Sequence, residues 1–271
     1  MERRSSTSRP VCSRQPAAVP SGPVADRSSI EWTEATWNPV TGCSKVSPGC
    51  AHCYAETLSL RFHWSRKPWL PSYAAENVVL HPERMEQPLR WRRPRLVFVN
   101  SMSDLFHENV PLDFVRSVFD VMAAAERHTF QILTKRPERL LELAPDLPWP
   151  RNVWIGVSIE NRRWLARANP LRLVPAAVRF ISAEPLLGPL DDLNLDGIDW
   201  LIAGGESGYN HRPVQEEWIR QLRDLCLERR VPFFFKQIGG RTPKAGGREL
   251  DGREWSQMPL PKRRRAAVLA S

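Results

Sequence analysis

Short apolar runs rich in Val, Ile and Phe alternate along this chain with stretches whose apolar residues recur at helical spacing. The clearest runs predict strands at residues 96–100, 129–134, 153–158, 178–182, 200–203 and 232–236, with fainter candidates at 37–42 and 77–80. Such nearly continuous apolar runs are typical of parallel strands that are covered on both faces. The helical spacing predicts helices over residues 112–127 and 215–230, the first of them starting after Pro111.

Strand and helix alternate six to eight times between residues 30 and 258. This alternation predicts an α/β fold, a (β/α) barrel or partial barrel of six to eight parallel strands, with a doubly wound open sheet as the alternative. We find no linker inside this body, so we expect a single domain over residues 30–258. Residues 1–29, rich in Ser, Pro, Arg and Ala, predict a disordered leader, and residues 259–271 predict a basic disordered tail.

Polar side chains follow the apolar runs at once in nearly every unit. They are Asn100, Ser101 and Asp104, then Lys135 and Arg136, Ser158 and Glu160, Ser182 and Glu184, Glu206, and finally Lys236 and Gln237. In a parallel barrel the carboxyl ends of all strands open on one rim, which holds the active site of such enzymes. Polar residues also end strands in ordinary proteins, but six such units in succession favour a functional rim.

The composition fits a globular protein, with 42% hydrophobic and 25% charged residues among 271. No apolar run approaches the length of a membrane span, and the N-terminus lacks the apolar core of a signal peptide, so we expect a cytoplasmic protein without a membrane partner. Of the formal net charge of +9, the leader carries +3 and the tail +4, which leaves +2 for the body. The tails can therefore add weak, salt-sensitive affinity for nucleic acid, while the body is close to neutral.

Three of the five cysteines lie within eleven residues, in the spacing Cys43-x6-Cys50-x2-Cys53. Cys12 lies in the leader and Cys226 in a helical pattern, where we expect a packed core thiol, so neither is an obvious fourth ligand. A closed structural metal site draws all four ligands from the protein. Three thiolates without a fourth therefore suggest a metal or cluster with one open position, in a reducing compartment.

A cysteine trio on the loop after the first strand of a (β/α) barrel resembles the radical S-adenosylmethionine (radical SAM) superfamily. More narrowly, the resemblance is to the phage Gp37/Gp68 family, and it covers the chain from about Ile30 to Gly240. It is carried by residues 37–43, 47–55, 101–106, 133–136, 204–206 and 233–237. Two features depart from the superfamily pattern: six residues separate Cys43 from Cys50 where most members have three, and the Gly-Gly-Glu ending at Glu206 follows about the seventh predicted strand rather than the second.

The resemblance implies a [4Fe-4S] cluster held by Cys43, Cys50 and Cys53, with SAM on the fourth iron. It further implies reductive cleavage of SAM to a radical that abstracts hydrogen from a substrate, and an electron donor of the flavodoxin or ferredoxin type. His52 matches the position whose ring packs near the adenine. The residues we expect to bind the cofactor are His52, Tyr54, Asn100, Ser101, Ser158, Glu160, Ser182, Glu206 and Lys236.

We expect Asp104, Lys135 and Glu184 to be the catalytic residues. Cations on a partly desolvated rim suit anions, so Lys135, Arg136 and Lys236 are candidates to bind the SAM carboxylate or a substrate phosphate. The alternative is that these cations pair across the rim with Asp104, Glu160, Glu184 or Glu206. The remaining aromatic candidates, the histidines His107 and His211 and the tryptophans Trp32 and Trp37, are expected to be structural.

The substrate is not identified by the sequence, and a nucleic acid or nucleotide is the candidate by analogy with a phage-related family. One alternative is a zinc site with His52 or His63 as fourth ligand in a nucleic-acid-binding protein. Another is a cluster-bearing protein without turnover that acts with a partner encoded nearby. A thiol redox enzyme using Cys50 and Cys53 is less favoured, because the thioredoxin-like context is missing.

Overall fold

The computed structural model describes residues 28–242 and 244–259. The predicted leader and tail, with Cys12, fall almost wholly outside these described residues. No helix in the described ranges is long and apolar enough to cross a membrane.

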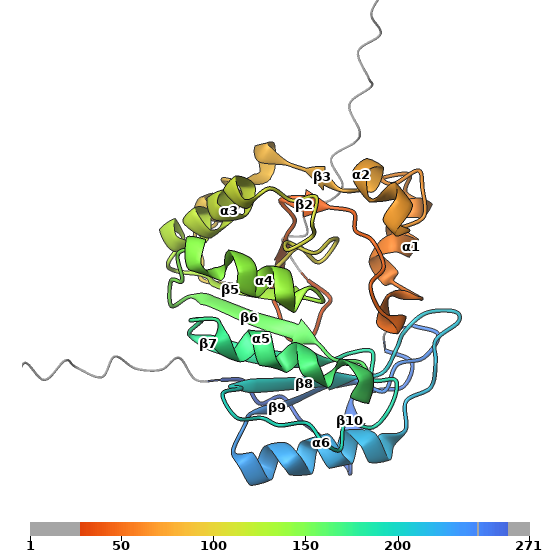
Figure 1. The fold of residues 1–271 in the computed structure, drawn as a ribbon. Helices are drawn as coiled ribbons and strands as arrows, with labels where there is room; N and C mark the ends of the chain where they lie inside the picture. Colours follow the sequence, from red (N-terminus) through yellow and green to blue (C-terminus); the bar gives the residue numbers. More distant parts are fainter. Residues whose placement is uncertain (1–27, 243, 260–271) are drawn as a thin grey trace, which may run out of the picture.

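Seven parallel strands form one curled sheet, a half-barrel (Figure 1). They are β1 (Ala35–Trp37), β4 (Leu96–Val99), β5 (Thr129–Thr134), β6 (Val153–Ser158), β7 (Val178–Ala183), β8 (Trp200–Gly204) and β9 (Phe233–Gln237). Their order across the sheet equals their order along the chain. The predicted α/β partial barrel is therefore confirmed, and the doubly wound alternative is wrong, because a doubly wound sheet needs a reversal of strand order.

Helices and short 3-10 turns connect the strands. The α-helices are α1 (Tyr54–Arg61), α2 (Ala74–Asn77), α3 (Leu112–Ala124), α4 (Pro137–Leu143), α5 (Ala168–Leu173) and α6 (Glu216–Arg229). The 3-10 turns are η1 (Pro48–Cys50), η2 (Pro71–Tyr73), η3 (Pro82–Arg84), η4 (Gln87–Arg90), η5 (Ala144–Asp146) and η6 (Arg162–Arg167). Cys226 on α6 is fully buried against the sheet, as predicted for a core thiol.

The predicted strand at 37–42 is wrong. The chain leaves the main sheet after Trp37, and β2 (Val40–Thr41) pairs instead with β3 (Val79–Leu80) in a separate antiparallel pair. Pro39 interrupts the run, because proline has no N–H to donate to a neighbouring strand. A further short pair, β10 (Glu249–Leu250) and β11 (Arg253–Glu254), lies near the C-terminal end of the described chain. With β2 and β3 outside the half-barrel, Glu206 follows its sixth strand and not the seventh.

Two separate apolar clusters occupy the two faces of the sheet. The larger one joins strands to the helices, including α3 and α6. The smaller one contains no helical residue, so it lies on the concave face. Its buried members, here called the aromatic floor, are Trp32, Phe98, Trp154, Val178, Phe180, Trp200, Ile202 and Phe234. Trp32 and Trp37 are thus core residues, as predicted, with 3% and 0% of their surface exposed.

Trp200 lies at the centre of the aromatic floor. Its ring centroid is 5.5 Å from that of Phe180 and 6.0 Å from those of Trp154 and Phe234. Its indole N–H donates to the carbonyl of Gln257 at 2.9 Å. The floor therefore closes the interior with dense aromatic packing.

Replacing Trp200→Ala is expected to lower the free energy of unfolding by about 3–5 kcal/mol, because a large cavity replaces a buried ring. Urea unfolding followed by circular dichroism measures this loss. The control is Leu173→Ala at a side chain that is 70% exposed, where we expect a change within about 0.5 kcal/mol. Similar losses in the two variants would contradict the central role of Trp200.

Candidate functional site

The cysteine loop, residues 42–53, begins directly after β2 and ends at the start of α1. Gly42 has φ +79° and donates its N–H to the carbonyl of Met102 at 2.9 Å, which ties the loop to the segment after β4. A β-carbon at Gly42 would stand 1.8 Å from the backbone oxygen of Asn77, so only glycine fits. The loop is thereby fixed beside the carboxyl ends of the strands.

Burial and neighbouring charges act on two thiols of this loop, Cys43 and Cys53. Burial raises the pKa of Cys43 to about 12; the guanidinium of Arg136 opposes this rise, and charge on Asp104, Cys50 and Cys53 adds to it. Burial likewise raises the pKa of Cys53, which charge on Cys50 raises further. Such thiols stay protonated at neutral pH unless a bound cation compensates three thiolates.

No group of three His, Cys, Asp or Glu side chains in the described part of the chain is arranged to hold a single metal ion. Three thiolates on one zinc ion would stand about 3.8 Å apart, given a Zn–S bond of about 2.3 Å in a tetrahedron. In a four-iron cluster, by contrast, each thiolate binds a different iron. Cys43, Cys50 and Cys53 supply three free thiols from one loop, which is the number and kind of donor that fits a cluster with one open iron.

Arg136 joins the cysteine loop to the end of β5. Its guanidinium donates to the sulfur of Cys43 at 3.5 Å, to Asp104 at 3.2 Å, to Glu108 at 3.1 Å and to the carbonyl of Ser44 at 3.1 Å. Burial alone would lower the pKa of Arg136, but Asp104, Cys43 and Glu108 raise it above the ordinary value. Only 5% of the side chain is exposed, so Arg136 stays charged and positions the loop.

Asp104 also binds the end of β5, through Thr134 and Lys135. One carboxylate oxygen accepts from the Thr134 hydroxyl at 2.7 Å and the Phe106 N–H at 3.0 Å, and the other accepts from the Lys135 N–H at 3.0 Å. With Arg136 as its ion-pair partner, Asp104 is engaged on both oxygens. The expected catalytic role of Asp104 stays a prediction, because nothing in this geometry shows a contact with substrate.

Polar residues lie at and just after the carboxyl ends of the strands, beyond the aromatic floor, and we call them the chamber residues. Alternate residues of a strand face the same side, so Ser158, Ser182 and Lys236 share the concave face with floor residues of β6, β7 and β9. The other chamber residues follow just after the ends of β4, β5, β6 and β7. The chamber residues are Asn100, Lys135, Ser158, Glu160, Ser182, Glu184 and Lys236. Seven of the predicted site residues are thus brought together.

Ion pairs form between the chamber residues, as in the alternative by which the lysines pair with carboxylates across the rim. Lys236 pairs with Glu184, and the ammonium of Lys135 is 4.0 Å from Glu160. Glu160 is fully buried and pairs closely with Arg167 at 2.9 Å. Lys135 is therefore the cation with the longest of these contacts, and it is the one best placed to exchange its partner for an anionic ligand.

Polar atoms in the chamber lack partners. Ser158 and Ser182 are register partners on β6 and β7, and their side chains are 1% and 0% exposed. Neither hydroxyl, nor the side-chain amide nitrogen of Asn100, has a hydrogen-bond partner among the described residues. Buried polar groups are normally satisfied, so the three atoms point to a ligand with hydrogen-bonding groups.

A second tie joins the Gly-Gly-Glu loop to the cysteine loop. His52 and Glu206 are hydrogen-bonded at 3.0 Å, Arg212 donates to Glu206 at 2.9 Å, and Arg212 also donates to the carbonyl of Pro48 at 3.0 Å. Burial would raise the pKa of Glu206, but the hydrogen bonds from Arg212 and His52 outweigh it and hold the pKa below its usual value. His52 and Glu206, both expected to bind the cofactor, thus bind each other here.

Tyr54 and Ser101 form a third contact at the mouth. The Tyr54 hydroxyl donates to the carbonyl of Ser101 at 2.7 Å, and the Ser101 hydroxyl donates to Asn38 at 3.2 Å. Half of Tyr54 is exposed, so this side chain reaches the surface directly after Cys53.

Sequence reasoning missed Ser47, Arg167 and Arg212. The Ser47 hydroxyl donates to Glu160 at 2.5 Å, from the cysteine loop to the chamber. Arg167 and Arg212 stand outside every motif, and their partners Glu160 and Glu206 lie seven and six residues earlier in the chain. No sequence signal singles them out from the other arginines. His107, bonded to the Ser44 hydroxyl at 2.9 Å and 1% exposed, is structural as predicted.

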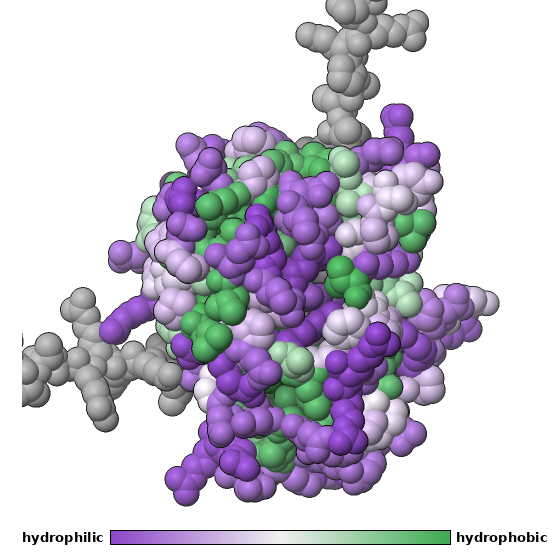
Figure 2. Space-filling view, in the orientation of Figure 1, coloured by the Kyte–Doolittle hydropathy of each residue, from purple (hydrophilic) through white to green (hydrophobic). Residues whose placement is uncertain are grey.

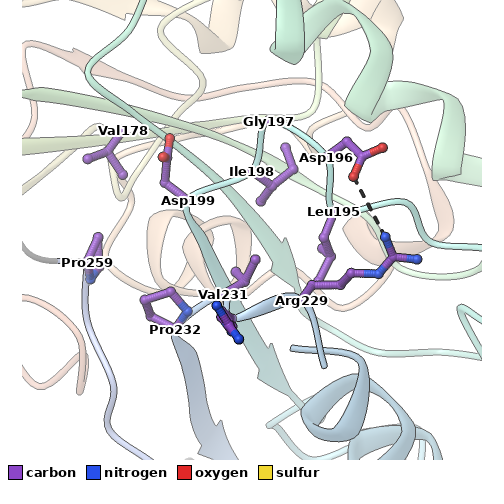
Figure 3. Close-up of a pocket in the computed structure, with 11 residues that line it drawn as sticks. Val178, Leu195, Asp196, Gly197, Ile198, Asp199, Arg229, Val231, Pro232 and Pro259 are labelled. Carbon is purple, nitrogen blue, oxygen red and sulfur yellow. Dashed lines mark ion pairs between the residues drawn. The ribbon is translucent and has the colours of Figure 1, made fainter. Parts of the chain in front are cut away.

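A pocket at the other end of the half-barrel is not this site (Figure 3). Val178, Asp199 and Pro232 line it and lie at or just before the amino ends of β7, β8 and β9. Active sites of barrels lie at the carboxyl ends. A second pocket lies on the cysteine side, between Val46, Lys135, Arg136 and Arg167. Figure 2 shows mainly hydrophilic residues over the centre of the molecule in this view.

Comparison with known families assigns the chain. The family described as "Protein of unknown function (DUF5131)" matches residues 27–259. This chain belongs to the DUF5131 family. No curated protein is a significant match to the DUF5131 chain. The phage Gp37/Gp68 name stays a prediction.

Solved structures of spore photoproduct lyase share part of the arrangement of this DUF5131 protein. The lyase complexed with dinucleoside spore photoproduct has a TM-score of 0.44 at 14% identity, covering 73% of this chain and 62% of the lyase. A mutant lyase with bound AdoMet and dinucleoside spore photoproduct has a TM-score of 0.44 at 14% identity, covering 71% and 60%. The chain thus spans less than two thirds of the lyase, and nothing about its ligands follows from this similarity.

Replacing Arg136→Met is expected to cost about 3–5 kcal/mol of unfolding free energy, because it leaves Asp104 buried without a counter-charge. Urea unfolding measures the loss. The control is Arg139→Met, whose pair with Glu142 is partly exposed, and where we expect less than about 1 kcal/mol. Adding Asp104→Asn to Arg136→Met should cost less than the two single losses together. Strictly additive losses would show that the two residues are not coupled.

Stability is expected to depend on pH through Glu206. A carboxyl whose folded pKa is depressed stabilises the protein above its unfolded pKa of about 4.3, and this contribution is lost as pH falls through the folded pKa. Glu206→Gln should therefore lower the unfolding free energy at pH 7, with the difference from wild type shrinking below about pH 4.3. Unfolding curves across that range measure it, with Glu249→Gln as an exposed control. A difference that does not change with pH would contradict the expectation.

Proposed function

We propose that this DUF5131 protein is a radical SAM-like iron–sulfur enzyme that acts on an unidentified substrate. The observation that carries the proposal is the position of Cys43, Cys50 and Cys53. Three free thiols stand on one loop at the carboxyl ends of a parallel half-barrel, and burial raises the pKa of two of them, Cys43 and Cys53. Beside them lies a polar chamber with unpartnered buried hydroxyls.

In this proposal Cys43, Cys50 and Cys53 hold a [4Fe-4S] cluster with one iron left for SAM. When bound, the cluster and SAM supply a one-electron reductive cleavage that yields a radical able to abstract hydrogen. The protein holds Cys43 by the guanidinium of Arg136, which donates to its sulfur. Backbone groups of Ala55 and Glu56, at the start of α1, act on Cys53 and favour its thiolate.

The chamber residues would bind SAM and substrate. Lys135, whose contact with Glu160 is long, is proposed for the SAM carboxylate. The hydroxyls of Ser158 and Ser182 can each donate and accept, which suits ribose or an amino group. The other proposed cofactor contacts are His52, Tyr54, Asn100, Ser101, Glu160, Glu206 and Lys236.

Proton handling is proposed for Glu184, which faces the same chamber and shares an ion pair with Lys236. Asp104 would contribute by fixing the backbone N–H of Lys135. The electrons would come from a donor of the flavodoxin or ferredoxin type in the cytoplasm. A nucleic acid or nucleotide is the substrate class we carry forward.

Anaerobic reconstitution should give a brown protein with about four irons per chain, a [4Fe-4S]⁺ signal in electron paramagnetic resonance that shifts when SAM is added, and 5′-deoxyadenosine under strong reductant. Cys43→Ala should lose the iron and the signal, because one of three ligands is gone. Cys226→Ala, which removes the buried thiol of α6, is the matched control and should keep both.

Other outcomes would identify the alternatives. Colourless protein with one tightly bound zinc ion would reject the cluster and support a zinc-stabilised binding protein. A full cluster without a SAM-dependent shift would point to a cluster protein without turnover, acting with a partner. A full cluster that shifts with SAM but never cleaves it would also reject the proposed enzyme.

A further inference from the structure

The end of α1 and the segment after it carry an exposed aromatic ring, Phe62, and a partly exposed one, Trp64, interleaved with cations. Phe62 is 52% exposed, and Trp64 stacks on it with ring centroids 5.2 Å apart and an interplanar angle of 28°. The guanidinium of Arg61 lies 5.7 Å from the centre of the Phe62 ring. We call Arg61, Phe62, Trp64, Arg66 and Lys67 the aromatic–cationic platform.

The cations of the platform are not neutralised. Arg61, Arg66 and Lys67 are exposed, and none forms an ion pair with another described residue. The nearby carboxylate of Glu56 is buried and already paired with Lys45 at 2.8 Å. The platform therefore carries free positive charge, although the body as a whole is nearly neutral.

The platform is held rigidly. The N–H groups of Trp64 and Ser65 both donate to the carbonyl of Ser59, at 2.8 and 3.1 Å, and close the end of α1. Trp69 anchors the far side: it is 3% exposed, and its N–H donates to Glu56 at 2.8 Å. The exposed rings are thus displayed by a buried network, and a ligand would not have to order them first.

The platform adjoins the cysteine loop. The N–H of Lys45, two residues after Cys43, donates to the carbonyl of Trp69 at 3.0 Å. The Lys45–Glu56 ion pair joins the same two segments again. In Figure 1 the platform lies between α1 and α2, on one side of the half-barrel.

We propose that the aromatic–cationic platform binds single-stranded nucleic acid, with bases stacked on Phe62 and Trp64 and phosphates on Arg61, Arg66 and Lys67. Stacking on aromatic rings is tolerant of sequence, and cations without partners accept phosphates without breaking ion pairs. A strand held here would lie beside the cysteine loop. The binding stands without the radical chemistry; only the step from bound strand to substrate rests on the proposed function.

A lipid surface is the other occupant that aromatic and basic residues suit. Interfacial helices bury one continuous apolar face, whereas α1 has only eight residues. The exposed apolar side chains after it are separated by Arg61, His63, Arg66 and Lys67. A nucleic acid, which alternates bases with phosphates, matches this interleaving better.

The test measures fluorescence anisotropy of a labelled oligothymidine of about a dozen nucleotides with the full-length protein. Phe62→Ala should weaken binding about tenfold, since one stacking surface is lost. Arg66→Ala with Lys67→Ala should reduce the slope of log affinity against log salt by about 0.7 for each cation. The matched control is Arg92→Ala with Arg93→Ala, an exposed pair elsewhere, and it should change neither. Both tails are kept throughout, so their contribution is common to all variants.

Unchanged affinity in both platform variants would overturn the inference, and so would binding to phosphatidylserine vesicles without binding to the oligonucleotide. The same proteins are then reconstituted with iron. Intact oligonucleotide binding without SAM cleavage would reject the proposed function alone. SAM cleavage in a protein that does not bind the oligonucleotide would reject the platform alone.

Discussion

A parallel strand turns successive side chains to opposite faces of its sheet, and the site described here depends on that constraint. On the concave face, β6 presents Trp154, Gly156 and Ser158, and Glu160 follows just beyond its end. On this face, the residues near the middle of the strands are the aromatic side chains of the floor. The residues two to four positions closer to the carboxyl ends carry hydroxyl or charged groups. The half-barrel therefore changes from apolar to polar within one strand, without any change of direction.

Three arginines hold the polar end together, each by joining two segments. Arg136 links the cysteine loop to Asp104, Arg167 links η6 to Glu160, and Arg212 links Glu206 to the carbonyl of Pro48. Buried charges are tolerable only when they are paired, so each link also fixes the geometry of its neighbours. With these charges satisfied, the unpartnered hydroxyls of Ser158 and Ser182 and the side-chain amide nitrogen of Asn100 remain available to a ligand, as does Lys135.

Most of the strands and the polar rim were predictable from the sequence. Six apolar runs predicted strands within about one residue of those observed. The polar residues at their carboxyl ends lie on one rim in any parallel half-barrel, so that prediction did not depend on the register. The failure at residues 37–42 has a local cause in Pro39, which diverts the chain into a side pair. The ion pairs were left as an alternative, since partners such as Lys236 and Glu184 lie 52 residues apart. Arg167 and Arg212 were missed for a different reason: their partners Glu160 and Glu206 lie only seven and six residues away, but the pairing arises from loop geometry that no local pattern encodes.

The glycine that opens the cysteine loop has a wider consequence. The backbone oxygen of Asn77 occupies the space where a β-carbon of Gly42 would stand, and the side chain of Asn77 also bonds to Ser65 and to the carbonyl of Pro68. Asn77 thus contacts both the cysteine loop, at Gly42, and the segment after α1, at Ser65 and Pro68. A substitution in α2 that moves the backbone of Asn77 would therefore alter the spacing of the three sulfurs, although no cysteine is changed.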